Sequence, residues 1–190
     1  MKFTLKIIAL ITMFASITLL TSCSTNIAEY KNTEPALDIK TYFNGPLVAW
    51  GMVQDYNKKV TRRFCVEMQG TWEGDTGLLA EKFYFNDGEV SYRNWVLTRT
   101  GTNNYNGEAE DVIGTAKGVQ HGFALQWEYQ LSVNIDETNY TFTLDDWMYR
   151  IDDYRVFNRT QMKKLGVTVA EITLFFDKEQ PLRTCASAST

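Results

Sequence analysis

The sequence predicts an all-β domain in which an antiparallel up-and-down meander closes into a barrel, preceded by a short N-terminal helix. In two stretches, 62–72 and 121–131, large apolar residues recur at alternate positions over most of the length, which is the pattern of strands that bury one face and solvate the other. No Pro occurs between residues 47 and 180, as expected where most backbone N–H groups are paired in β-ladders. An open meander of this length would leave exposed edge strands, and closure removes them.

The composition excludes several classes of protein. The chain has 190 residues, of which 44% are hydrophobic, enough for one ordinary domain with a real core. A formal net charge of −4 argues against a nucleic-acid binder, which needs a basic face. The single His, His121, excludes a multi-His metal site, and we expect neither a metal nor a separate cofactor.

The first 22 residues predict a lipoprotein signal peptide. Lys2 and Lys6 precede an apolar stretch, Ile7 to Leu20, that is shorter than the roughly 20 residues of a spanning helix. The sequence Leu20-Thr21-Ser22-Cys23 resembles the bacterial lipobox, which implies cleavage before Cys23 and a covalent lipid on its thiol. The alternatives are a plain secretory peptide with an incidental Cys, or an anchor that stays uncleaved.

The lipid would hold the protein at the membrane. Removing residues 1–22 takes away Lys2 and Lys6 and lowers the formal net charge from −4 to −6, so electrostatics would not bind this body to anionic lipid. Ser24 stands where the inner-membrane retention signal of Gram-negative lipoproteins is Asp. We therefore expect the periplasmic face of the outer membrane, with attachment through the acyl chains on Cys23.

The mature chain divides into a lipidated tether (23–36), the barrel domain (37–178) and a disordered tail (179–190). Asp38 can cap a short helix through Tyr42 and Phe43, which Asn44-Gly45-Pro46 ends. Met162 to Gly166 is interpreted as a turn or a short helix. The expected strands, separated by turn signals, are 47–55, 60–72, 78–86, 89–99, 109–119, 121–133, 138–150, 153–158 and 166–176.

Two cysteines remain after the lipidated one. Cys65 lies on the polar face of its strand and Cys185 in the loose tail, and an oxidising periplasm permits a disulfide between them. Two free thiols are the alternative.

Glu81 is an acid on a core-facing row, with Leu79 and Phe83 on the same side. A buried carboxylate needs a partner or a raised pKa. A two-residue loop at Asp87-Gly88 would place it opposite Asn94. A three-residue loop from Asn86 to Gly88 would place it opposite Arg93, with Leu79 opposite Trp95, and we favour this register. The pair is interpreted either as a structural ion pair or as an anchor for the polar end of a ligand.

The stretch Asp145-Asp146-Trp147-Met148 is the second unusual feature. Either Asp145 and Trp147 point inward or Asp146 and Met148 do, and parity with Leu144 favours Asp146. Neighbours on a strand face opposite sides, which disfavours both Ca²⁺ binding and paired-acid chemistry. Trp95, Trp127 and Trp147 are candidates for an aromatic cavity wall, although aromatic residues more often fill a core. His121 is interpreted as an ordinary rim residue. No nucleophile motif is recognisable, and we expect the protein not to be an enzyme.

The predicted architecture resembles the lipocalin or calycin class. A series of stretches is also similar to an uncharacterised family of proteobacterial lipoproteins, a domain of unknown function. The resemblance covers residues 30–178 and implies a lipoprotein with a single domain, but no reaction. The stretches are 37–38, 42–46, 49–51, 70–74, 87–88, 93–95, 111–114, 145–148 and 158–159.

These observations favour a lipoprotein whose lipocalin-like barrel binds or transfers a hydrophobic or amphiphilic small molecule. The candidate ligand-binding residues are Glu81, Arg93, Trp95, Trp127, Asp146 and Trp147. The alternative is a non-enzymatic envelope interaction protein, or scaffold, with a filled barrel core. The expected partners are the membrane, through the anchor, and a lipid-like ligand. Protein partners are left open.

Overall fold

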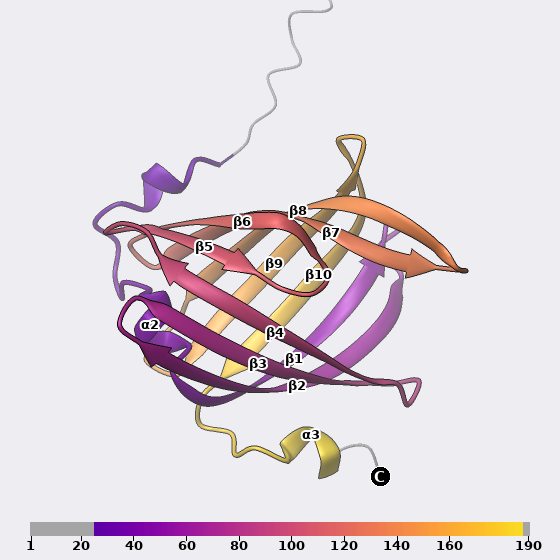
Figure 1. Cartoon of the computed structure of the whole chain (residues 1–190), viewed down its shortest axis with the longest axis horizontal. Coiled ribbons are helices and arrows are strands. Elements are labelled where there is room, and N and C mark those ends of the chain that lie inside the picture. Colours follow the sequence, from indigo (N-terminus) through magenta and orange to yellow (C-terminus); the bar gives the residue numbers. More distant parts are fainter. Residues whose placement is uncertain (1–24, 188–190) are drawn as a thin grey trace, which may run out of the picture.

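A computed structural model of the chain describes residues 25–187. The predicted signal peptide and Cys23 lie outside the described residues. The described part forms a closed barrel with the strand order β1-β10-β9-β8-β7-β6-β5-β4-β3-β2 (Figure 1). Every neighbouring pair is antiparallel, which confirms the all-β meander and its closure. The strands are β1 (Gly45–Asp55), β2 (Val60–Glu73), β3 (Thr76–Phe85), β4 (Val90–Arg99), β5 (Asn104–Glu108), β6 (Val112–His121), β7 (Ala124–Ile135), β8 (Thr138–Arg150), β9 (Arg155–Lys164) and β10 (Val167–Asp177).

The barrel has one strand more than the sequence predicts, since β5 lies between the expected strands 89–99 and 109–119. Its sequence, Asn-Tyr-Asn-Gly-Glu, is rich in residues that are depleted in strands, and only Tyr105 supplies a large buried side chain. The segment 162–166 also differs from the prediction. Residues Met162 to Lys164 continue β9 and pair with β10, and only Leu165 and Gly166, both at positive φ, form the turn.

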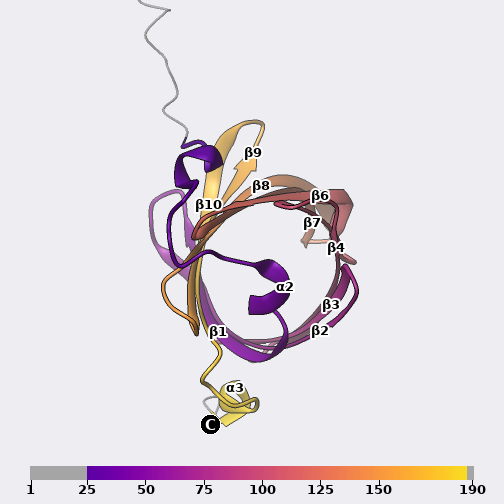
Figure 2. The ribbon, with the colours of Figure 1, turned by 90° about the vertical axis from the view of Figure 1, so that its left-hand side faces the viewer.

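The predicted short helix forms, and it closes one end of the barrel. The Asp38 side chain accepts a hydrogen bond from the Thr41 N–H at 2.8 Å and caps α2 (Ile39–Tyr42). Viewed along the barrel, α2 lies inside the ring of strands (Figure 2). The Trp72 indole N–H donates to the Phe43 carbonyl at 3.1 Å and ties the end of the helix to β2.

Gly70 makes this closure possible. A Cβ at this position would lie 1.8 Å from the Phe43 carbonyl oxygen, which is far closer than van der Waals contact. A larger residue would therefore push the helix out of this end of the barrel. In an up-and-down meander the hairpins β1–β2, β3–β4, β7–β8 and β9–β10 turn at the opposite end, and these form the second mouth (Figure 1).

The N-terminal segment, predicted as a tether, packs on the barrel from residue 26 onward. Asn26 and Glu29 form a capping box around the 3₁₀ helix η2 (Ile27–Tyr30). The Tyr30 ring packs edge-on against Phe123, with centroids 5.1 Å apart. The Leu37 N–H then donates to the Gly122 carbonyl at 2.7 Å. A sequence pattern cannot show this, because its partners lie about 90 residues away.

The segment predicted as a disordered tail carries the short helix α3 (Thr184–Ser187). Cys65 and Cys185 form a disulfide, with their Cα atoms 5.5 Å apart. The Cys185 N–H also donates to Glu67 Oε1 at 3.0 Å. The disulfide and this bond fasten the segment to the outer face of β2, which is why its polar composition does not leave it loose.

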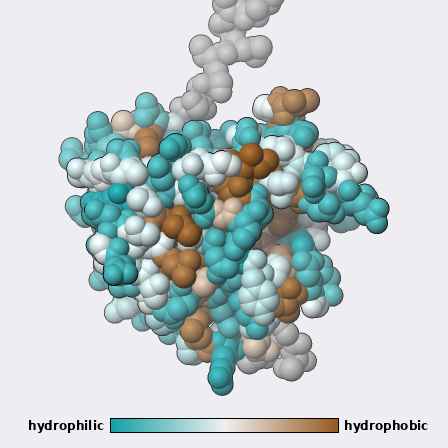
Figure 3. Space-filling view, viewed as in Figure 1, coloured by the Kyte–Doolittle hydropathy of each residue, from teal (hydrophilic) through white to brown (hydrophobic). Residues whose placement is uncertain are grey.

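The face of the barrel shown in Figure 3 is mainly hydrophilic, with separate apolar patches. No helix between residues 25 and 187 is long and apolar enough to cross a membrane. All strand pairings, the core and the disulfide are formed within these residues. A chain that begins at residue 24 therefore contains every element of the barrel.

Candidate ligand-binding cavity

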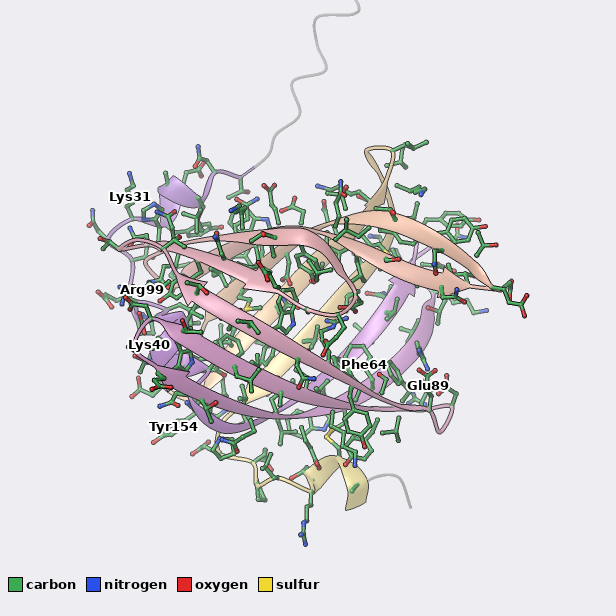
Figure 4. All side chains as sticks on the ribbon, in the orientation of Figure 1. Lys31, Lys40, Phe64, Glu89, Arg99 and Tyr154 are labelled. Atoms are coloured by element: carbon green, nitrogen blue, oxygen red, sulfur yellow. A yellow bond between two sulfur atoms is a disulfide. The ribbon has the colours of Figure 1, made fainter. Side chains whose placement is uncertain are left out.

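The barrel encloses a cavity of about 350 Å³. Its walls are the inward rows of β1–β4 and β7–β10, and Ile39 and Phe43 bound it at the α2 end. The other end leads to the hairpin mouth, where Phe64 and Glu89 are labelled in Figure 4, opposite Lys40 beside α2. The volume is in the range of small-molecule sites, roughly 300–1,000 Å³. The interior is therefore not filled by side chains, contrary to the alternative of a filled barrel core.

Two glycines allow the Trp127 ring to lie against the barrel wall, away from the centre of the cavity. Cβ atoms at Gly118 and Gly107 would lie 1.9 Å and 2.5 Å from the Trp127 ring, so the indole lies flat against the backbone of β5 and β6. Trp95 meets Trp127 edge-on at 6.1 Å and Tyr129 at 5.5 Å. Edge-to-face packing fixes all three rings against each other, and they form a preformed apolar wall.

The predicted register of the β3–β4 hairpin is correct. Glu81 pairs with Arg93 and Leu79 with Trp95, because Gly88 adopts a positive φ of 88° in a three-residue loop. Glu81 Oε2 and Arg93 Nη1 are 3.9 Å apart, which is too far for a hydrogen bond.

Arg93 bonds instead to Asp111, which follows β5. Arg93 donates from Nε and Nη2 to Asp111 Oδ2 at 3.1 and 2.6 Å. Glu81 Oε2 is buried and has no hydrogen-bond partner among the described residues. Burial, together with the carboxylates of Asp111 and Asp146, raises the pKa of Glu81 to about 7, although the charge of Arg93 and the Trp95 side chain oppose the rise.

Asp146 is the second buried acid of the cavity. Only 7% of the residue is exposed, and its Oδ1 accepts a hydrogen bond from the Asn158 side-chain amide. Burial raises its pKa to about 7, although hydrogen bonds from Asn158 and Thr160 favour the charged form. Tyr129, which also lines the cavity, has a pKa well above its ordinary value, mainly through burial and then through Asp146.

Arg62 lies at the hairpin mouth and also faces two acids. Its Nη2 is 2.5 Å from Glu89 Oε2 and 2.9 Å from Asp87 Oδ2. The guanidinium lies over the Phe85 ring, 3.5 Å from its centroid, so this side chain is held at the edge of the cavity by charge and by the aromatic face.

Five of the six predicted ligand-binding residues line the cavity: Glu81, Arg93, Trp95, Trp127 and Asp146. Trp147 does not, and the prediction for it is wrong. Its indole N–H donates to Asp145 Oδ1 at 2.9 Å and its ring stacks on Tyr149 at 6.1 Å, outside the barrel. The cause is the alternation of side chains along a strand, since an inward Asp146 turns its neighbour outward.

Several residues of the site were not predicted. Tyr129 belongs to the recognised inward row of β7, so parity alone could have identified it. Asp111 lies in a loop, and only the folded chain brings it to Arg93. His121 lies at the α2 end, with Nδ1 3.3 Å from Asn103 Nδ2. Within residues 25–187, no group of three or more His, Cys, Asp or Glu residues is placed to hold a metal ion.

A closed antiparallel barrel with a helix across one end and an apolar cavity inside defines the lipocalin-like class. The family model described as "Protein of unknown function (DUF3833)" matches residues 17–178, and the chain belongs to this family. This confirms the resemblance to a family of unknown function with a lipocalin-like barrel. No curated protein matches the sequence.

Twelve solved chains match the structure. One is the S-type phycobiliprotein lyase CPES from Guillardia theta, with a TM-score of 0.52 and 5% sequence identity, over 73% of this chain and 88% of that chain. At this identity the match shows the shared fold alone. It contradicts the expectation that the protein is not an enzyme, because this barrel architecture is also that of a lyase.

Proposed function

We propose that the protein is a lipid-anchored lipoprotein of the outer membrane, facing the periplasm, whose barrel binds or hands on a hydrophobic or amphiphilic small molecule. The cavity carries this proposal: it is preformed, apolar on most of its wall, and bears a few inward polar side chains. Such an arrangement is typical of small-molecule sites. The anchor is supported by the order of Lys2, Lys6, the apolar stretch and Cys23 in the sequence.

Native mass spectrometry of the chain from residue 24, purified from cells without detergent, tests ligand binding. We expect a second mass that corresponds to a bound apolar molecule. An orthogonal test uses the neutral fluorescent probe N-phenyl-1-naphthylamine, whose emission rises in an apolar cavity. If neither a bound mass nor saturable probe binding is found, the proposal is wrong.

A matched pair of variants locates the binding. Met148 lines the cavity, whereas Thr143 on the same strand is exposed on the outer face. Met148→Trp should fill the cavity and weaken probe binding at least about tenfold, a loss of about 1.4 kcal/mol. Thr143→Trp adds the same ring outside and should leave probe binding unchanged. Equal effects of both variants would place the probe on the surface.

The anchor is tested separately. In Gram-negative cells that express the full chain, we expect radiolabelled palmitate on the protein and its recovery with the outer membrane. Cys23→Ser should lose the label. A label that persists in the variant would exclude Cys23 as the lipidated residue.

A second candidate function is acid–base chemistry on the bound molecule. It is favoured by two buried carboxyl groups, Glu81 and Asp146, with pKa values of about 7 beside the same cavity, since groups that titrate near neutrality suit proton transfer. The test returns the co-purified molecule to the protein and follows its mass between pH 5 and 9. Conversion that is lost in Glu81→Gln supports this function, and an unchanged mass over several hours contradicts it.

A further inference from the structure

The arginines of the cavity lining are engaged by acids that lie outside the lining. Within the described residues, its lining contains two cationic side chains, Arg62 and Arg93, and each faces two carboxylates. Arg62 bonds to Asp87 and Glu89, and Arg93 lies between Asp111 and Glu81. Asp146, on β8, adds a further carboxyl group to the cavity lining. With all groups ionised, the three acids outside the lining, Asp87, Glu89 and Asp111, neutralise the two arginines, so that the negative charges of Glu81 and Asp146 remain uncompensated.

Hydrogen-bonding capacity is unbalanced in the same direction. Glu81 Oε2 and Asp111 Oδ1 are both buried acceptors without a donor among the described residues. A buried acceptor that lacks a donor costs about 1–3 kcal/mol, and more when it is charged. The Arg93 donors at Nε and Nη2 are already bound to Asp111. What the cavity lacks is therefore a positive charge and hydrogen-bond donors.

On the basis of the binding function proposed above, we infer that the ligand carries a cationic, hydrogen-bond-donating group on an apolar body, as a long-chain amine does. Its ammonium group would lie against Glu81 and Asp146, with its chain along the Trp95–Trp127 wall. A carboxylate or phosphate headgroup would instead be repelled by Glu81 and Asp146. It would find no free cation, because Arg62 and Arg93 already bond to other acids. A neutral headgroup would leave the negative charge uncompensated.

The preference of the cavity for a cationic group should depend on pH, because Glu81 and Asp146 can bind protons. The titratable and charged groups around Glu81 and Asp146 are Arg93 from β4, Asp111 from the loop after β5 and Tyr129 from β7, and Asp145 on the outer face of β8 also raises the pKa of Asp146. Burial holds the pKa of both acids at about 7, so the empty cavity is partly protonated at neutral pH. A bound cation stabilises the charged carboxylates, and acidification must therefore weaken its binding.

The test compares three ten-carbon probes that differ only in the headgroup: decylamine, decanol and decanoate. Binding to the chain from residue 24 is measured by isothermal titration calorimetry at pH 8 and pH 6, where decylamine stays cationic and decanoate anionic. At pH 8 we expect decylamine to bind at least about tenfold more tightly than decanoate, and to lose about tenfold of its affinity at pH 6. Decanol should change little with pH.

The outcomes separate this inference from the function on which it depends. If decanol or decanoate binds and decylamine binds no more tightly, the cavity is a ligand site but the inference is wrong. If none of the three probes binds, both the inference and the binding function are overturned.

Two carboxyl variants and a matched control test whether Glu81 and Asp146 bind the ammonium group. Asp146→Asn and Glu81→Gln should each weaken decylamine binding at pH 8 by about tenfold and leave decanol binding unchanged. Asp145→Asn, the neighbouring acid on the outer face of β8, should affect neither probe. Equal losses for Asp145→Asn and Asp146→Asn would show that the cavity acids do not hold the amine.

A variant that removes the acid bound to Arg93 tests whether this pairing sets the preference of the cavity for a cation. Asp111→Asn frees Arg93, and we expect decanoate affinity to rise and decylamine affinity to fall. Glu108→Gln, an exposed acid on β5, is the control and should leave the preference unchanged. An undiminished decylamine preference in Asp111→Asn would contradict the role assigned to the Arg93–Asp111 pair.

Discussion

Glu81 and Arg93 face each other across the β3–β4 hairpin, yet the closest approach of their charged groups is 3.9 Å. Arg93 directs its hydrogen bonds to Asp111, and Glu81 is left as a buried acid with a raised pKa. A pair that looks like a structural ion bridge in the sequence is therefore a poorly compensated carboxyl group on a cavity wall. Such a group reduces stability, and proteins retain these groups mainly at functional sites.

The stability of the empty protein should decrease as the pH rises from about 4.5 to about 7. The folded pKa of Glu81 is raised from 4.5 to about 7, so in this interval the folded state holds a proton that the unfolded chain releases. The stability that depends on this proton is present at low pH, and it is lost as the pH rises through the pKa of Glu81 in the folded state. Glu81→Gln should therefore stabilise the protein at pH 8 by about 1–3 kcal/mol, and less at pH 5.

Urea denaturation at the two pH values measures this effect, and Asp145→Asn is the matched control. The pKa of Asp145 is lowered, because hydrogen bonds and the charge of Lys163 outweigh its partial burial. Its removal should destabilise the protein at both pH values. If Glu81→Gln destabilises the protein equally at pH 5 and pH 8, the charge of Glu81 is compensated and our description of the site fails.

Gly118→Ala should destabilise the barrel by about 1–3 kcal/mol, because a methyl group would lie 1.9 Å from the Trp127 ring and force the indole into the cavity. The same variant should reduce binding of N-phenyl-1-naphthylamine. Gly101→Ala is the control, since the nearest atom there is the end of the flexible Asn104 side chain at 3.2 Å, and its effect should stay within about 0.5 kcal/mol. Thermal unfolding of both variants decides whether the wall depends on glycine at position 118.

Local patterns predicted the parts of the site that depend on strand parity and turn chemistry. The register of Glu81 and Arg93 follows from the Asn86-Asp87-Gly88 loop, and the inward position of Asp146 follows from alternation with Leu144. Asp111 could not be predicted as part of the site, because its role depends on a contact between a loop and β4. The strand β5 was missed for a related reason. Its Asn and Gly residues have weak strand propensity, and pairing with β4 and β6 stabilises them.

The Cys65–Cys185 disulfide should contribute about 2–4 kcal/mol, because it closes a long loop, with 120 residues of separation between the cysteines. Dithiothreitol should lower the guanidinium midpoint of the wild-type protein to that of the double variant Cys65→Ser, Cys185→Ser. The double variant should not respond to reductant. A wild-type midpoint that is insensitive to dithiothreitol under unfolding conditions would show that the bond is not formed.

The packing of Tyr30 has a consequence for the distance between the anchor and the barrel. Its ring contacts Phe123, Trp147 and Tyr149 with centroid distances of 5.1, 6.1 and 6.0 Å, and backbone hydrogen bonds order the turn around it. If Cys23 is lipidated, few residues separate the membrane from a segment that is already fixed to the barrel. Tyr30→Ala should release this segment and lengthen the connection.

Hydrogen exchange measured by mass spectrometry tests this prediction. In Tyr30→Ala the amides of Glu29 and Thr33, which are bonded to Asn26 and Tyr30 in the native fold, should exchange much faster, while the strands keep their protection. Tyr56→Ala is the matched control, since this ring is 74% exposed in the β1–β2 turn and its loss should change no exchange rate near residue 30. Fast exchange at these amides in the wild-type protein would mean that the segment is a loose tether after all, and the barrel would then be free to move away from the membrane surface.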